Sequence, residues 1–190
     1  MERSLAILDY WFGPKAGQEF WFGADEATDR EVREKFSKDL DDAVAGKLKA
    51  WEDDPERTVA LVVLLDQFSL QLFREQRRSY DQAALALPIV ERALARGFDR
   101  KVSFFKRAFL YMPFMHSEDL ALQDKGVELF SQLAADAPPE HREAAGGFLK
   151  FAKIHRDIVK EYGRFPGRNE GYGRTNTPAE QKYLDEGGFF

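Results

Sequence analysis

The spacing of apolar residues is the feature that most restricts what this chain can fold into. Within residues 25–45, Val32, Phe36, Leu40 and Val44 recur at every fourth position. That spacing places side chains on one face of an α-helix. No pair of segments shows the strict alternation around a tight turn that a β-hairpin requires. The sequence therefore predicts an all-α protein.

Proline, glycine and capping residues divide the chain into further helices. Ser79 with Gln82 fits a capping box at the start of one helix, and Pro113 is expected to divide two others. A loop is expected to hold the aromatic residues 20–22. The predicted helices cover residues 4–12, 25–45, 55–73, 79–97, 101–111, 114–134 and 138–162.

The last helix has the clearest start signal. Thr177 is suited to the N-cap, Pro178 to the first helical position and Glu180 to the third. Because the loops between the helices are short, we expect the helices to pack mostly as antiparallel pairs. The length of 190 residues predicts a single helical domain over residues 1–190.

Composition limits the class of protein. The net charge of −5 argues against a general nucleic-acid binder, and the absence of cysteine excludes disulfides and thiolate chemistry. The N-terminus lacks the pattern of a signal peptide. The longest strongly apolar run, residues 59–65, is far too short to span a membrane. We therefore expect a cytoplasmic protein with neither nucleic-acid nor membrane partners.

Residues 163–177, here named the arginine segment, hold three arginines among four glycines. Glycine lets a backbone approach another group closely, and guanidinium groups suit carboxylate or phosphate. Residues 150–182 carry eight Lys and Arg against four Asp and Glu, although the whole chain is acidic. The expected partner is an anionic small molecule, an acidic peptide or a carboxylate of the protein itself.

Asp66 is a carboxylate on an otherwise apolar helix, where it shares a stripe with Val59, Val62 and Phe73. An unpaired buried carboxylate is costly, so Asp66 is expected to have a cation or several donors as partners. Two interpretations remain open. Asp66 either forms a structural ion pair or cap, or contacts a ligand directly.

The histidines allow a similar pair of interpretations. His155 lies on the apolar stripe of its helix. It is either a core histidine whose ring nitrogens have hydrogen-bond partners, or part of a site near the arginine segment. His116, Ser117 and Glu118 follow Pro113 and form a candidate acid–base group. In the alternative, Ser117 or Glu118 caps the next helix. No local spacing of metal ligands or phosphate-binding loop occurs, so neither a metal nor a cofactor is predicted.

Several motifs, in order, resemble the bacterial domain-of-unknown-function family 924. They are LDYWFG (8–13), FWFG (20–23), LLDQF…LFR (64–74), FLYMPFMHSED…Q (109–123) and GRFPGRN…GRTNTPAE (163–180). The resemblance covers nearly the whole chain and implies a tetratricopeptide-like helical fold with no settled activity. The positions that match family motifs, and that we take as candidate site residues, are Asp66, Gln67, Arg74, Tyr111, His116, Ser117, Glu118, His155, Arg164, Arg168, Asn169 and Arg174.

Two departures from the family pattern concern polar positions. Gly167 stands where the family usually has His, and residues 69–71 read Ser-Leu-Gln instead of Pro-Arg-Asn. If the family is enzymatic and uses that His as acid or base, this member is inactive or altered. If the site only binds, these changes alter the ligand.

Three hypotheses about function follow. The first is a helical module that binds a phosphate- or carboxylate-bearing ligand or peptide through the three arginines, with Asp66 and Gln67 holding them in place. The second is a small-molecule hydrolase or lyase in which His116 is the general acid or base and Glu118 orients it. The third is a protein-interaction module in which the arginine segment is an internal latch onto Asp66 and Glu118. The sequence makes no prediction of oligomeric state.

Overall fold

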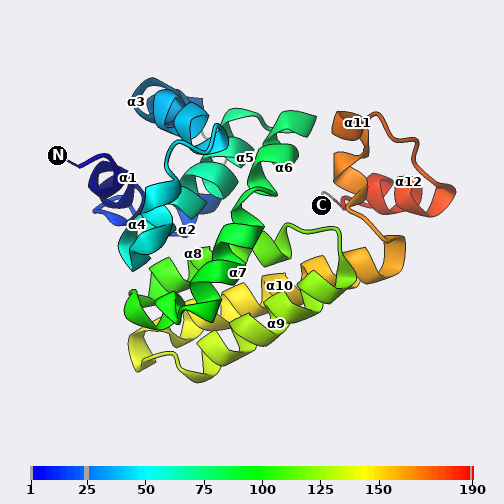
Figure 1. Cartoon of the computed structure of the whole chain (residues 1–190). Helices are drawn as coiled ribbons and strands as arrows, with labels where there is room; N and C mark the ends of the chain where they lie inside the picture. Colours follow the sequence, from blue (N-terminus) through cyan, green and yellow to red (C-terminus); the bar gives the residue numbers. More distant parts are fainter. Residues whose placement is uncertain (1, 24–25, 189) are drawn as a thin grey trace. The chain divides into compact units, whose positions relative to one another are not determined.

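The computed structural model describes residues 2–23, 26–188 and 190, and every regular element within these ranges is a helix (Figure 1). This confirms the all-α prediction. The α-helices are α1 (Arg3–Phe12), α2 (Gln18–Phe22), α3 (Glu26–Val44), α4 (Pro55–Val62), α5 (Ser69–Leu72), α6 (Arg77–Ala83), α7 (Ala86–Ala95), α8 (Phe104–Met115), α9 (Leu120–Ala135), α10 (Arg142–Tyr162), α11 (Asn169–Tyr172) and α12 (Pro178–Asp185). The shorter helical elements are η1 (Lys49–Asp53), η2 (Val63–Phe68), η3 (Phe98–Lys101), η4 (Pro139–His141) and η5 (Pro166–Arg168).

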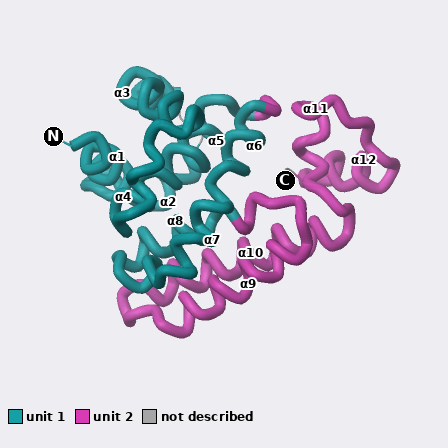
Figure 2. Tube along the Cα trace, in the orientation of Figure 1, with its two compact units in different colours: residues 1–74, 78–113 teal, residues 75–77, 114–190 magenta. Residues whose placement is uncertain are grey.

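The chain divides into two compact units, each described here by itself (Figure 2). Unit 1 consists of Met1–Arg74 and Arg78–Pro113, and unit 2 consists of Glu75–Arg77 and Phe114–Phe190. The single domain expected over residues 1–190 stays a prediction, as does the tetratricopeptide-like arrangement.

The centre of unit 1 is the continuous helical stretch formed by α4, η2 and α5. All side chains from Thr58 to Ser69 are buried there. Asp54 caps the start of α4, because its carboxylate accepts a hydrogen bond from the Arg57 N–H at 3.0 Å. The predicted helix over 55–73 is therefore confirmed as helical and central. Its middle turn, η2, is a π-helix, a wider turn that the apolar pattern does not reveal.

Aromatic side chains hold the N-terminal helices of unit 1 together. Trp11 lies edge-on to Phe68 and Phe109, with ring centroids 5.5 and 5.6 Å apart. The indole N–H of Trp21 donates to the carbonyl oxygen of Trp11 at 2.8 Å. Residues 20–22 belong to α2, so the predicted loop at this place is wrong. Aromatic packing orders the short helix, which its local sequence alone does not signal.

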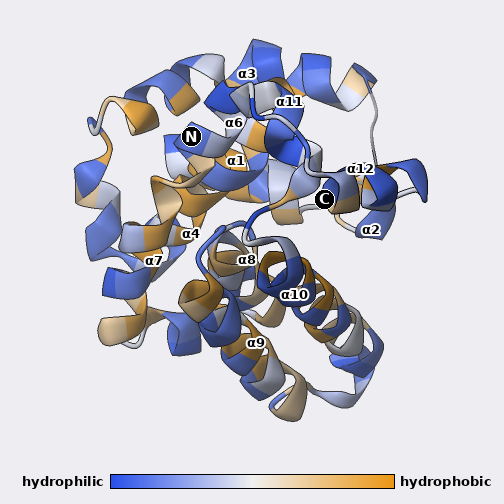
Figure 3. Cartoon of the chain, turned by 90° about the vertical axis from the view of Figure 1, so that its right-hand side faces the viewer, coloured by the Kyte–Doolittle hydropathy of each residue, from blue (hydrophilic) through white to orange (hydrophobic). Residues whose placement is uncertain are grey.

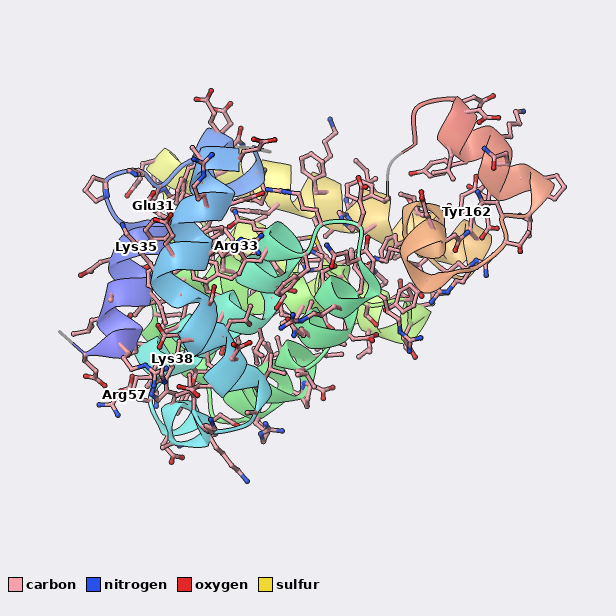
Figure 4. The ribbon with its side chains drawn as sticks, turned by 90° about the horizontal axis from the view of Figure 1, so that it is seen from above. Glu31, Arg33, Lys35, Lys38, Arg57 and Tyr162 are labelled. Atoms are coloured by element: carbon pink, nitrogen blue, oxygen red, sulfur yellow. The ribbon has the colours of Figure 1, made fainter. Side chains whose placement is uncertain are left out.

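Ion pairs cover the exposed side of α3, along which Figure 4 labels Glu31, Lys35 and Lys38. Glu31 accepts hydrogen bonds from Lys35 and Lys15, which lower the pKa of its carboxyl to about 2. The helix confirms the prediction over residues 25–45, whose first residue, Asp25, lies outside the described residues. These exposed pairs identify the solvent-facing side of the helix.

Two predicted helix boundaries are wrong. Ser79 lies inside α6, and the helix predicted over 79–97 is divided into α6 and α7. Pro88 lies in the first turn of α7, where a missing N–H costs no internal hydrogen bond. Pro113 lies within α8, and the chain leaves the helix only after Met115. A proline in the last turn removes a single backbone hydrogen bond of the helix, and the rest of α8 still forms.

Unit 2 is built on α9 and α10, which lie side by side as a helical hairpin (Figure 1). Hydrophobic and hydrophilic residues alternate along both helices (Figure 3), as expected for amphipathic neighbours. The rings of Phe130 and Phe148 stack across the pair with centroids 6.0 Å apart. Gly163 ends α10 in the left-handed conformation, with φ of 72°. The segment after it forms η5, α11 and α12. None of the helices in the described ranges is long and apolar enough to cross a membrane.

Candidate functional site

Arg164 is fixed by an ion pair with Glu180. Its Nε donates to Glu180 Oε1 at 2.6 Å and one terminal nitrogen donates to Oε2 at 2.8 Å. Glu180 is only 2% exposed. It also completes the predicted capping box, which is confirmed, because Glu180 and Thr177 exchange backbone-to-side-chain hydrogen bonds. The hydrogen bonds from Arg164 lower the pKa of Glu180 to about 2.

Arg174 forms the second ion pair, with Glu118. Its two terminal nitrogens donate to the two carboxylate oxygens at 3.0 and 2.8 Å. The N–H of Phe165 donates to the same carboxylate at 3.1 Å. Burial alone would raise the pKa of Glu118, but the hydrogen bonds from Arg174 and Phe165 lower it below its usual value. Glu118 is thus a latch partner of the arginine segment, as the third hypothesis predicted.

Arg168 contacts the backbone of His116, and its charge also helps to lower the pKa of Glu118. One of its terminal nitrogens donates to the backbone carbonyl of His116 at 2.8 Å. Its guanidinium lies over the ring of Phe165 at 4.4 Å from the centroid. Next to it, the Asn169 side chain is 1% exposed and donates to Asn176 Oδ1 at 2.7 Å. The 116–119 turn and the arginine segment are therefore joined at several points.

The turn over residues 116–119 is held from both sides. Gln123 donates through its side-chain nitrogen to the carbonyl oxygens of Met115 and Ser117, both at 2.6 Å. Asp119 caps α9 by accepting from the N–H groups of the first helical turn. The prediction that Ser117 or Glu118 caps this helix is therefore wrong, because Glu118 is taken by Arg174 and Asp119 is the better placed carboxylate.

His155 lies beside this turn and is 7% exposed. Its ring centroid is 6.2 Å from that of His116 and 5.6 Å from that of Phe165. Nδ1 of His155 lies 2.8 Å from the carbonyl oxygen of Phe151, one turn earlier on α10. Burial lowers the pKa of His155 to about 3, and the charges of His116 and Arg168 act in the same direction. Its imidazole is therefore neutral at physiological pH.

A family described as bacterial protein of unknown function (DUF924) matches residues 7–188. This chain belongs to the DUF924 family. A solved structure of the protein of unknown function ATU0120 from Agrobacterium tumefaciens covers 97% of both chains, with 36% sequence identity and a TM-score of 0.85. Among curated proteins, no match was found.

Asp66 and Gln67, the DUF924 motif residues on η2, lie in unit 1. Asp66 is fully buried and accepts a hydrogen bond from the side chain of Gln67, which also contacts the sulfur of Met112 at 3.5 Å. Arg164 and Arg174 have their carboxylates, Glu180 and Glu118, within unit 2. That Asp66 and Gln67 hold the three arginines in place stays a prediction.

The other two candidate residues of unit 1 also have internal partners. Arg74 forms a bidentate pair with Asp29 at 3.0 and 2.9 Å. The Tyr111 hydroxyl donates to Asp99 and accepts from Arg107 Nε, both at 2.7 Å. Burial is the main reason that the pKa of Tyr111 rises to about 12. The assignment of Arg74 and Tyr111 as site residues of this DUF924 chain stays a prediction.

The sequence did not single out Gln123, Asn176 or Glu180 as site residues. Gln123 stands in a DUF924 motif and Glu180 in a capping box, but their bonds to distant groups have no sequence signal. Within the described ranges, no group of three or more His, Cys, Asp or Glu side chains is placed to hold a metal ion. What the structure brings together in unit 2 is His116, Glu118, His155 and the arginine segment.

Proposed function

We propose that this protein is a helical binding module that takes an anionic, phosphate- or carboxylate-bearing ligand beside Arg168, His116 and His155. The observation that carries the proposal is the meeting of these three groups in unit 2. Arg168 and His116 both disfavour a proton on His155. A bound anion would offset that repulsion, because an opposite charge stabilises cationic groups around it.

The other two arginines act as the latch that frames the site. Arg164 and Arg174 each bind a carboxylate of unit 2 through two hydrogen bonds. Ligand binding is assigned to Arg168 because Arg168 contacts the His116 backbone and its charge acts on His155.

Binding is supported better than catalysis. The acid–base hypothesis needs Glu118 to orient His116, but the contacts of Glu118 are with Arg174 and the Phe165 N–H. At position 167, where the family usually has His, this chain has glycine. A hydrolase or lyase that uses His116 as general acid or base stays a prediction.

The test is calorimetric titration with inorganic phosphate and with citrate, alongside thermal melts. A ligand at about 100 times its Kd should stabilise the folded protein by about 2.7 kcal/mol. Arg168→Ala should abolish binding while the circular dichroism spectrum stays helical. Arg168→Lys should bind weakly, because an ammonium group keeps the charge but loses the planar fork.

Arg142→Ala is the matched control, because Arg142 is an exposed arginine of the same unit. It removes the same charge and should bind as the unmodified protein does. Equal affinity of Arg168→Ala and Arg142→Ala would contradict the proposed site.

A further inference from the structure

The side chain of Phe190 covers the imidazole ring of His155 within unit 2. The two ring centroids lie 4.1 Å apart, and the ring planes are inclined at 49° to each other. The Phe190 side chain also packs against a small apolar cluster formed by Ile158, Val159 and Phe165. An aromatic ring in this position keeps water and dissolved ions away from the part of the imidazole that it touches.

The backbone of Phe190 is tied to the arginine segment. The N–H of Gly167 donates to the backbone oxygen of Phe190 at 2.7 Å. Gly167 directly precedes Arg168, whose guanidinium donates to the backbone carbonyl of His116 at 2.8 Å. The ring and the backbone oxygen of Phe190 therefore contact two parts of the proposed site, which are His155 on α10 and the arginine segment.

Of the rings that pack on His155, that of Phe190 is the one best placed to move. Within the described part of the chain, the ring contacts of His155 are with His116, Phe165 and Phe190. His116 belongs to the proposed site itself, and Phe165 is a core residue that is only 1% exposed. Phe190 is partly buried. A side chain that buries less apolar surface costs less free energy to move into water, so Phe190 can leave the His155 ring more readily than Phe165 can.

We infer that Phe190 regulates the proposed anion site by competing with the ligand for the His155 ring, an inference that rests on the proposed function. A ligand that contacts His155 has to displace the Phe190 side chain. The site is then competent only in the fraction of molecules in which Phe190 has moved away, and the measured Kd is the intrinsic Kd divided by that fraction. Minor conformations are commonly about 0.1–10% populated, so removing the Phe190 ring should lower Kd at least about tenfold.

The same cover affects the protonation of His155. Burial is the main cause that lowers the pKa of His155 to about 3, and the charges of His116 and Arg168 lower it further, while the hydrogen bond with the Phe151 carbonyl acts in the opposite direction. Without the Phe190 ring, water reaches the imidazole and the effect of burial becomes smaller. The pKa of His155 should therefore rise when Phe190 is removed, and should stay below its ordinary value because the two neighbouring charges remain.

The deciding experiment titrates the unmodified protein and Phe190→Ala with inorganic phosphate and with citrate, by calorimetry near neutral pH and at equal ionic strength. Phe190→Ala is expected to lower Kd at least about tenfold. Phe190→Leu keeps part of the apolar cover and should give a smaller gain, which serves as the test should Phe190→Ala fail to fold. Phe151→Ala is the matched control, because the Phe151 side chain is 49% exposed on α10 and its backbone carbonyl is retained. This control should bind as the unmodified protein does.

The possible outcomes separate the inference from the proposed function. An equal or higher Kd in Phe190→Ala would overturn the inference and leave the anion site standing. Binding of neither anion to either protein would overturn the proposed function, and the inference with it. NMR titration of the His155 ring against pH gives a second readout that needs no ligand. The pKa of His155 is expected to rise in Phe190→Ala, and an unchanged pKa would overturn the inference.

Discussion

Arg174 and Glu118, 56 residues apart in the chain, form a bidentate ion pair within unit 2. The N–H of Phe165 joins the same carboxylate. The pair ties the turn that carries His116 to the segment that carries Arg168. It therefore sets the geometry of the proposed site without itself being assigned to the ligand.

Replacing Glu118 should show how much this tie contributes to stability. Glu118→Gln keeps the size of the side chain but removes its charge, and should lower the free energy of unfolding by about 1–3 kcal/mol. Urea unfolding measures the change. Glu128→Gln, on the exposed side of α9, affects only surface contacts with Lys125 and Gln132 among those described, and should change stability by less than about 0.5 kcal/mol. Similar losses of unfolding free energy in Glu118→Gln and Glu128→Gln would contradict a stabilising role of the Arg174–Glu118 pair.

Arg164→Ala should be more damaging, because it leaves the Glu180 carboxylate buried without its cation. Breaking a buried pair costs about 3–5 kcal/mol, and the partial exposure of Arg164 favours the lower end. The thermal midpoint should fall by several degrees. Lys182→Ala removes an exposed charge from the same helix and should leave the midpoint nearly unchanged. An unperturbed melt of Arg164→Ala would exclude this part of the latch.

His155 should make stability depend on pH in a range where carboxylates contribute little. Burial, followed by the charges of His116 and Arg168, lowers its pKa to about 3 in the folded protein, against an ordinary value of 6.5. The unfolded state therefore binds more protons between these values, so stability should fall as pH falls from about 6.5. Glu180 adds a loss of the same sign only below its ordinary pKa of 4.5.

Urea unfolding at a series of pH values measures this slope. His155→Phe should flatten it between about pH 6.5 and 5, whereas Glu180→Gln should leave that range unaltered. A slope that persists in His155→Phe would assign the effect to another group.

Gly171 is required by a close approach within unit 2. A Cβ at this position would lie 2.4 Å from the carbonyl oxygen of Glu75, a backbone atom that cannot move alone. Gly171→Ala should therefore destabilise the protein by about 1–3 kcal/mol. Gly147 lies inside α10 with open space around its position, so Gly147→Ala should stabilise by about 0.5–1 kcal/mol. Differential scanning calorimetry distinguishes the two directions, and a stabilising Gly171→Ala would refute the contact.

Gln71, at one of the positions that depart from the family pattern, should contribute little to stability. Neither polar atom of its buried amide has a hydrogen-bond partner among the described residues. Gln71→Met fills similar volume without unpaired polar atoms and should be neutral or stabilising in a thermal melt. Gln82→Met provides the contrast, since Gln82 accepts from the Ser69 hydroxyl at 3.2 Å and should lose about 1 kcal/mol. A large loss in Gln71→Met would indicate a water or ligand bound to the amide.

Most of the helices could be predicted because their signals are local. The capping box of Thr177 and Glu180 and the apolar stripe of α3 follow from residues within a few positions of each other. The errors arise where a local signal competes with packing. Ser79 fits a cap by sequence but is buried inside α6, and Pro113 is tolerated within α8. The π-helical turn η2 could not be recognised from the sequence, because every face of it is buried and its residues therefore show no apolar periodicity.

The sequence by itself determined that the chain is helical, which family it resembles, and that its arginine segment needs anionic or carboxylate partners. Only the tertiary structure decided that Arg164 pairs with Glu180, Arg174 with Glu118, and that His155 meets His116. Hydrogen bonding within a helix depends on neighbours three to five positions away, so sequence spacing records it. Which carboxylate reaches which arginine depends on how whole helices pack, and no spacing in the chain records that.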